Sequence, residues 1–106
     1  MKVTYEIENG KKVKVKTYAD GTVSKYDENG NEIYRKYPYG SEEWHEYDAN
    51  GNMIHFKRSD DFERWFEHDA YGNTIHTKDS EGNEDYYEYE YYPNGQPLKE
   101  IRYKII

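Results

Sequence analysis

The fold of this chain is decided by the stretch Tyr47-Asp48-Ala49-Asn50-Gly51-Asn52-Met53-Ile54-His55, because the same pattern recurs on both sides of it. An equivalent stretch begins 21 residues earlier, at Tyr26, and another begins 21 residues later, at His68. The glycine of each stretch and the isoleucine three positions after it keep this spacing. Many positions that repeat at one period indicate a tandem repeat protein.

The repeat divides the chain, as a single domain, into three regular units and two irregular ends. In the first unit, a one-residue insertion puts Gly10 out of step with Gly30. In the last, Gly95 follows Gly72 by 23 residues instead of 21. Terminal repeats commonly depart from the pattern, so both ends are predicted to be capping repeats. The predicted units are residues 1–25, 26–46, 47–67, 68–88 and 89–106.

Each unit is predicted to form two short strands joined by turns. Glycine and asparagine recur about every ten residues, which is too often for helices and typical of hairpins. Asn9-Gly10 and Asp20-Gly21 predict turns in the first unit, and the segment from Ile101 to Ile106 alternates as a final strand does. We therefore expect an all-β fold of about five tandem β-hairpin repeats, forming an elongated twisted antiparallel sheet or a short β-solenoid.

The strand register follows from two assumptions about the turns. If Ser80-Glu81-Gly82 is a three-residue loop with a left-handed glycine, Lys78 lies opposite Glu84. The same count places Lys57 opposite Glu63 and Lys36 opposite Glu42, which gives three opposite-charge pairs. If Asn50-Gly51 and Asn29-Gly30 are two-residue turns, Tyr47 lies opposite Ile54 and Tyr26 lies opposite Ile33.

Alternation along the strands then sorts the large side chains onto two faces. The expected core face carries Ile33, Ile54, Ile75, Tyr26, Tyr47, His68, Phe56, Phe66 and Tyr87. The other face carries Trp44, Trp65 and Tyr86, which are paired across strands with Tyr34, His55 and His76 and bordered by Glu46, Glu67 and Glu88. A register slip of one residue would exchange the two faces.

The motif Tyr-Asp-x-Asn-Gly-Asn-x-Ile at 21-residue spacing resembles the YD repeats of the RHS family. In that family, β-hairpin strips wind into large shells that enclose a toxin domain, and the resemblance implies a scaffold without chemistry of its own. Asn31, Asn52 and Asn73 stand where the family commonly has arginine, and five units are too few to enclose a domain. The resemblance therefore implies the hairpin architecture and not the shell function.

Two further resemblances are confined to short segments. Residues 91–100, with the sequence YYPNGQPLKE, look like the short repeat of antitoxins of the toxin-antitoxin repeat class. The aromatic pairs Trp65-Phe66 and Tyr86-Tyr87 resemble those of choline- and glucan-binding repeats of cell-wall proteins, although the second glycine-tryptophan step of those repeats is missing.

Composition and charge exclude several classes of function. A chain of 106 residues has little room for a large internal active-site chamber. The formal net charge of −7 opposes binding to duplex DNA, so no direct contact with nucleic acid is expected, but it suits a basic protein partner. No apolar run is long enough to span a bilayer, and the first residues do not resemble a signal peptide. With no cysteine in the chain, we expect a cytoplasmic protein that does not bind membranes.

No residue set in the sequence identifies a reaction. The 22 acidic residues contain no pair set apart by its spacing, so a solvated face explains them better than acid–base catalysis. His55 and His76 share a column, but Tyr34 interrupts it, and stacking on Trp65 and Tyr86 explains these imidazoles better than a metal does. The glycines occur at hairpin spacing rather than in a phosphate-binding loop. We expect no catalytic residues, no cofactor, no metal and no enzyme activity.

The aromatic column is the most informative candidate site. Its structural interpretation is cross-strand packing, whereas its functional interpretation is a docking surface, since tyrosine and tryptophan are enriched at binding hot spots. The leading hypothesis is an acidic inhibitor of a basic nuclease or nucleic-acid-binding protein, such as an immunity protein, an antitoxin or a phage-encoded anti-defence protein. The expected partner-binding residues are Trp44, Trp65, Tyr86, Tyr34, His55, His76, Glu46, Glu67 and Glu88.

Other hypotheses remain open at this point. The aromatic column also suits a carbohydrate- or choline-binding module, which would stack sugars or quaternary amines on its rings. The chain is alternatively a structural fragment of a longer repeat protein, although its irregular end units oppose this. An exposed terminal strand would also allow a homodimer.

Overall fold

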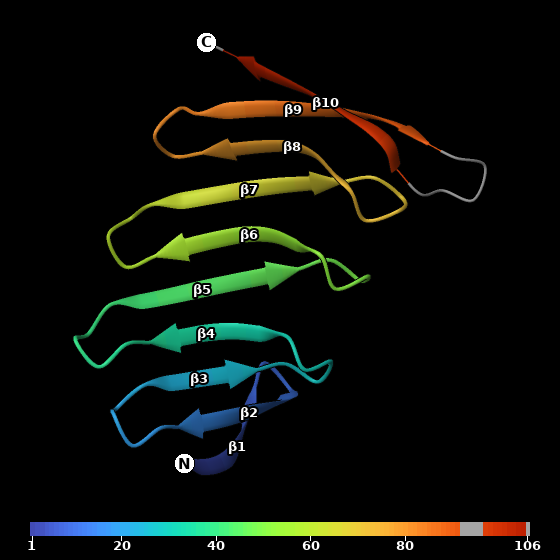
Figure 1. Ribbon diagram of the computed structural model, residues 1–106. Helices are drawn as coiled ribbons and strands as arrows, with labels where there is room; N and C mark the ends of the chain where they lie inside the picture. Colours follow the sequence, from blue (N-terminus) through green and yellow to red (C-terminus); the bar gives the residue numbers. More distant parts are fainter. Residues whose placement is uncertain (92–96, 106) are drawn as a thin grey trace.

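The structure, a computed structural model, describes the backbone of residues 1–91 and 97–105 and the side chains of residues 1–89. It contains one antiparallel sheet of ten strands whose order in space is their order in the sequence, with extents of 45 × 33 × 25 Å (Figure 1). The all-β prediction of tandem hairpins in an elongated sheet is confirmed. The strands are β1 (Lys2–Glu8), β2 (Lys11–Thr17), β3 (Val23–Tyr26), β4 (Glu32–Lys36), β5 (Glu42–Tyr47), β6 (Met53–Arg58), β7 (Glu63–His68), β8 (Thr74–Asp79), β9 (Glu84–Tyr91) and β10 (Pro97–Ile105).

The Asn-Gly turns of the regular units are three-residue turns, so the prediction of two-residue turns is wrong. In the turn between β5 and β6, Asp48 N–H donates to the carbonyl of Asn52 over 2.9 Å, and Gly51 takes a φ of 83°. The Asp48 carboxylate accepts the N–H groups of Asn50 and Asn52 at 2.9 Å each. This carboxylate selects the longer turn, because it satisfies two backbone donors inside the loop.

The longer turn changes the predicted register beside it. Tyr47 lies opposite Met53 instead of Ile54, because the ladder shifts by one residue between Glu46 and Tyr47. The same shift leaves Ile33 and Ile75 without a residue directly opposite, so each regular unit has a β-bulge at its isoleucine. The predicted pairing of Tyr26 with Ile33 is therefore wrong as well, since Tyr26 faces Glu32.

The other predicted pairings are confirmed. Three cross-strand pairs join lysine to glutamate at the opposite end of the hairpins, and the turn beyond the last of them encloses Ser80-Glu81-Gly82 between Asp79 and Asn83. Here too the glycine has a positive φ, of 89°. The confirmed pairs are Lys36 with Glu42, Lys57 with Glu63, and Lys78 with Glu84.

A recurring hydrogen bond joins each unit to the unit before it. The Tyr47 hydroxyl donates to the Glu32 carbonyl over 2.6 Å, and the Tyr89 hydroxyl donates to the Thr74 carbonyl over 2.6 Å. Between them, the His68 Nε2 lies 2.6 Å from the Met53 carbonyl. All three acceptors lie next to a bulge, so the side chain of one hairpin satisfies the backbone where the preceding ladder is irregular.

The N-terminal hairpin is built differently. Glu8 lies opposite Lys11, so the turn between β1 and β2 contains only Asn9 and Gly10. Both take positive φ, 53° and 77°, as a type I′ turn requires. The β1–β2 ladder continues from this turn without a register shift.

Among the described side chains, the buried apolar residues are Val13 and Val15, which are 4% and 6% exposed. Both lie on β2 beneath the side chain of Lys25, which starts on β3 opposite Val15. The Lys25 ammonium reaches across β2 to Glu6 and Glu8 on β1, at 3.2 and 3.0 Å. The aliphatic part of Lys25 therefore covers the valines while its charged end is paired.

The two faces of the sheet differ in burial. The predicted core face carries half-buried Phe56, Phe66 and Tyr87, and Thr77 on this face is only 5% exposed. The opposite face leaves its largest rings in solvent. We call the opposite face, which carries Trp44, Trp65 and Tyr86, the ring face. In the described part of the chain, no helix has the length and apolar character needed to cross a membrane.

Candidate functional site

The ring face displays six rings in a file that crosses strands β4 to β9. Tyr34 lies opposite Trp44, His55 lies opposite Trp65, and His76 lies opposite Tyr86. These pairings were predicted and are confirmed, because they depend on the lysine–glutamate turns and not on the Asn-Gly turns. The rings are brought to one face by strands that are adjacent in sequence.

Each pair is in ring contact. The ring centroids of Tyr34 and Trp44 are 5.8 Å apart with the planes tilted by 55°. Those of His55 and Trp65 are 5.6 Å apart and nearly parallel at 14°, and those of His76 and Tyr86 are 4.3 Å apart at 13°. Such contacts hold each large ring against the sheet surface.

The largest rings remain accessible although they are stacked. Trp44 is 39% exposed, Trp65 is 40% exposed and Tyr86 is 38% exposed. The near equality follows from the repeat, since these residues occupy one position in successive units. Equivalent positions lie two strand spacings apart, or roughly 9.6 Å. The result is a regular row of half-open aromatic surfaces.

Carboxylates hold both histidines of the file. The His76 Nδ1 lies 3.2 Å from Glu67, and its Nε2 lies 2.8 Å from Glu84. His55 has the same arrangement with Glu46 at 3.1 Å and Glu63 at 3.3 Å. Each imidazole of the file therefore lies between two carboxylates.

The ionisation of His76 reflects this environment. Burial opposes its charge, but hydrogen bonds to Glu84 and Glu67 outweigh burial and raise the pKa of His76 above its ordinary value of 6.5. In the first regular unit, Tyr34 takes the histidine position and donates its hydroxyl to Glu42. Burial and that hydrogen bond raise the pKa of Tyr34 to about 12, so this ring stays neutral at physiological pH.

The predicted acidic border is also on the ring face. Glu46 and Glu67 lie opposite the two histidines, and their side chains are 66% and 68% exposed. Glu88 takes the equivalent place on β9 and is exposed as well. The N-terminal unit differs, because Lys25 stands at this position and places its ammonium 5.5 Å from the Tyr34 ring centroid.

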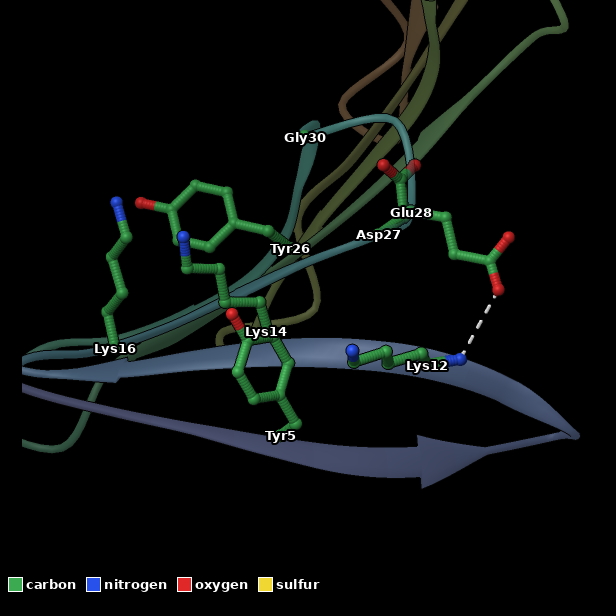
Figure 2. Close-up of a pocket in the computed structure, with 8 residues that line it drawn as sticks. All are labelled: Tyr5, Lys12, Lys14, Lys16, Tyr26, Asp27, Glu28 and Gly30. Carbon is green, nitrogen blue, oxygen red and sulfur yellow. Dashed lines mark hydrogen bonds between the residues drawn. The ribbon is translucent and has the colours of Figure 1, made fainter.

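The sequence prediction missed a second surface, on the N-terminal hairpin. A groove of about 530 Å³ opens on the face opposite the ring face, and Figure 2 shows the side chains that line it. Lys12 places its ammonium 4.4 Å from the Tyr5 ring centroid, and Lys16 places its ammonium 4.8 Å from that of Tyr26. The signal was present in the sequence, since Lys12, Lys14 and Lys16 alternate along one strand. The groove is lined by Tyr5, Lys12, Lys14, Lys16, Tyr26, Asp27, Glu28 and Gly30.

Charge is distributed unevenly along the chain. Residues 26–88 contain 17 acidic and 6 basic side chains, a formal net charge of −11. Residues 1–25 contain six lysines and three acidic side chains, a net charge of +3. The described residues include no group of three or more histidine, aspartate or glutamate side chains that would hold a metal ion.

Comparison with known proteins adds no family. No known family model matches the chain, and no curated protein matches it.

Proposed function

We propose that this protein is a non-enzymatic binding protein that docks its ring face on a basic macromolecule and blocks it. The observation that carries the proposal is the row formed by Trp44, Trp65 and Tyr86, each more than a third exposed. Tryptophan and tyrosine side chains that become buried when a partner binds supply large contact areas, and fixing them costs little conformational entropy. Rings that the repeat already holds in stacked pairs lose little further freedom on docking.

The charge around the rings supports a basic partner. Glu46 and Glu67 project from the border of the file with about two thirds of each side chain exposed. They belong to the 26–88 segment, whose net charge is −11. A segment with this charge attracts a basic groove during diffusional encounter and disfavours phosphate backbones. A nuclease or nucleic-acid-binding protein is therefore the proposed class of target, with the chain acting as an immunity protein, antitoxin or anti-defence inhibitor.

The architecture supports an inhibitor more than an enzyme. The ring face is an open sheet surface, and its histidines are engaged by carboxylates on both ring nitrogens. The kinship to YD repeats is likewise proposed, and it rests on the 21-residue recurrence of the turn, the bulge and the ring. In this proposal the repeat is a scaffold whose exposed rows have become a binding surface.

The test is a binding screen against a panel of basic nucleases and nucleic-acid-binding proteins, at low and high salt. Wild type is compared with Trp65→Ser and with Tyr39→Ser, a matched control on the exposed turn between β4 and β5. We expect one partner to bind the wild type and the control alike, to lose at least tenfold affinity for Trp65→Ser, and to weaken with salt. Binding that is indifferent to Trp65→Ser or to salt would count against the ring face.

A carbohydrate- or choline-binding module is the second candidate, favoured by the same exposed rings. Their spacing of roughly 9.6 Å along the row would let successive rings stack on successive parts of one glycan. Titration of tryptophan fluorescence with choline and with soluble glucans separates the two proposals. A saturable change supports the module, whereas an unchanged spectrum together with a basic protein partner supports the inhibitor.

A further inference from the structure

Strand β1 leaves one edge of the sheet open, and the proposed function gives this edge no role. Within the described part of the chain, β1 is the first strand in the sheet order and pairs on one side only, with β2. Its alternate residues Val3, Tyr5 and Ile7 are 41%, 57% and 72% exposed. Proteins usually protect a long open edge with charge, proline or a bulge. A regular seven-residue edge with three apolar side chains on one face is therefore available to pair with a further strand.

The turn shows which backbone groups of β1 face outward. In a two-residue hairpin, the residues that flank the turn exchange hydrogen bonds, so Glu8 and Lys11 form such a pair. Hydrogen-bonded and non-hydrogen-bonded pairs then alternate along an antiparallel ladder. Val3, Tyr5 and Ile7 therefore direct their N–H and C=O groups away from β2, toward the open edge.

We propose that β1 pairs with β1 of a second copy of this chain, in antiparallel orientation about a twofold axis at Tyr5. This register uses all seven residues of the strand, and Tyr5 faces its own equivalent. Val3 of each copy faces Ile7 of the partner subunit. The outward backbone groups of these three residues then meet one another in hydrogen-bonded pairs, which is the phase that an antiparallel ladder requires.

The charges fit this register as well. Lys2 of each copy lies opposite Glu8 of the partner subunit, and Thr4 lies opposite Glu6 of the partner subunit. Cross-strand pairs of opposite charge stabilise a ladder, whereas like charges destabilise it. Moving the register by two residues in either direction shortens the ladder to five pairs, and in one of these directions Glu6 also lies opposite itself. Of these three registers, the one centred on Tyr5 is the one in which all seven residues pair and no like charges lie opposite each other.

The basic groove does not oppose the pairing. Lys12, Lys14 and Lys16 lie one strand inward, on β2, as Figure 2 shows for the strand beside Tyr5. In the dimer, the two β2 strands are three strand spacings apart, or roughly 14 Å. This exceeds the screening length of about 8 Å in physiological salt, so repulsion between the two lysine rows is weak.

The twofold axis has a consequence for the ring face. An axis perpendicular to the sheet keeps equivalent faces on the same side, so both ring files would open in one direction. Such a dimer presents two copies of the binding row to a single surface, which raises avidity without any new contact. The dimer does not depend on the proposed partner, because β1 lies outside the ring file.

The test is the molar mass in solution as a function of concentration, measured by sedimentation velocity. We expect the wild type to dimerise reversibly. In the register centred on Tyr5, Lys2→Glu places a glutamate opposite Glu8 of the partner subunit at both ends of the ladder. The substitution should raise the dissociation constant of the dimer at least tenfold. Lys36→Glu makes the same charge change on the exposed side chain of β4 and should leave the dissociation constant within twofold of wild type.

A charge exchange tests the register itself. Glu8→Lys should weaken its own homodimer as Lys2→Glu does, but a mixture of the two variants should form a heterodimer, since both of its charge pairs are then opposite. Ile7→Lys provides a second probe that leaves Glu8 and its contact with Lys25 intact. Circular dichroism confirms that each variant is folded. A wild type that stays monomeric at all concentrations, a dimer unaffected by Lys2→Glu and Ile7→Lys, or a mixture without heterodimer would overturn the proposal.

Discussion

The N-terminal hairpin and the hairpin of β5 and β6 are both pairs of antiparallel strands, yet they solve the burial of a thin sheet in different ways. In the first, a two-residue turn continues into a regular ladder, and Lys25 covers two buried valines. In the second, a three-residue turn is followed by a bulge, and a large ring packs on the sheet while more than a third of it stays exposed. The difference shows that large exposed rings on this face of the sheet are a property of the regular units and not of the sheet as such.

Charge follows the same division. The first 25 residues are net basic at +3, whereas residues 26–88 are net acidic at −11. At the ring-border position, Lys25 serves the first hairpin and Glu46 serves the next unit. The same position of the repeat therefore carries a lysine that covers apolar side chains in the N-terminal unit and an exposed glutamate beside the rings in the next unit.

The largest expected effect comes from the turn of a regular unit. Gly51 has a φ of 83° with open space around an added Cβ, so Gly51→Val introduces backbone strain and no steric clash. A left-handed conformation costs an L-residue about 1–2 kcal/mol, and the loss falls in the middle of the sheet. We expect the free energy of unfolding, measured by urea titration, to fall by about 2 kcal/mol.

The matched variant is Gly10→Val, at a φ of 77° in the turn of the N-terminal hairpin. Its strain is similar, but β1 is an edge strand and its detachment leaves the other units paired. We expect a smaller loss for Gly10→Val than for Gly51→Val. Equal losses would mean that the two hairpins contribute alike to the stability of the whole sheet.

The hydrogen bond between units predicts the next effect. Tyr47→Phe removes the hydroxyl that donates to the Glu32 carbonyl, at a distance of 2.6 Å, and leaves the ring in place. The loss of such a bond in a partly buried site should lower the free energy of unfolding by about 1 kcal/mol. Tyr39→Phe, on the exposed turn between β4 and β5, is the control and should change stability by less than half as much. Thermal unfolding followed by tryptophan fluorescence measures the stability of both variants. If Tyr47→Phe were as stable as the wild type, this hydrogen bond would not contribute to the stability of the fold.

Lys25 separates covering from charge pairing in the N-terminal hairpin. Its hydrogen bond to Glu8 is the main factor that raises the pKa of Lys25, but the pair is partly exposed and should contribute less than about 1 kcal/mol. Lys25→Met keeps an apolar side chain over the valines, whereas Lys25→Ala uncovers them. We expect the alanine variant to be the less stable of the two in urea titration. The reverse order would show that the charge pair matters more than the cover.

The smallest expected effect is a pH dependence of the ring file. Because the folded pKa of His76 is raised above 6.5, the folded state binds its proton more tightly than the unfolded state does. The resulting stabilisation is fully present below pH 6.5 and is lost as the pH rises through the folded pKa. His76 and its carboxylate partners are partly exposed to solvent, so this pH-dependent stabilisation should be below about 1 kcal/mol.

The comparison within the repeat supplies the control for this effect. His76→Tyr places in the third regular unit the residue type that Tyr34 provides in the first regular unit. Because the pKa of Tyr34 is about 12, that side chain is neutral throughout the physiological range. Stability curves between pH 6 and pH 9 should therefore flatten in the variant relative to the wild type. A wild type whose stability rises over this range would contradict the proposed role of Glu67 and Glu84.

Much of this architecture follows from sequence, and the exceptions have identifiable causes. The lysine–glutamate ladder and the ring pairs were predicted correctly because a left-handed glycine three residues into the loop fixed the register. The Asn-Gly turns were assigned two residues because that dipeptide is typical of the shorter turn. The aspartate two positions before the asparagine, as at Asp48, is the signal that favours the longer turn.

The second surface was missed for a different reason. Lys12, Lys14 and Lys16 lie in the segment predicted only as a capping repeat, and alternate lysines on one strand are by themselves typical of a solvated face. A groove also depends on how far Tyr5 and Tyr26 stand from the lysines, and strand alternation does not supply that distance. The border glutamates were placed on the correct face, but their contacts with both nitrogens of each histidine required coordinates.

Because each strand of the described sheet meets only its neighbours in sequence, the molecule has no closing contact that fixes its length. A duplication of 21 residues would add one more ring, one more bulge and one more pair of strands while leaving every existing contact in place. Gene duplication within such a chain therefore lengthens the binding row in whole steps. Evolution is able to match the row to a longer or shorter target without redesigning a core.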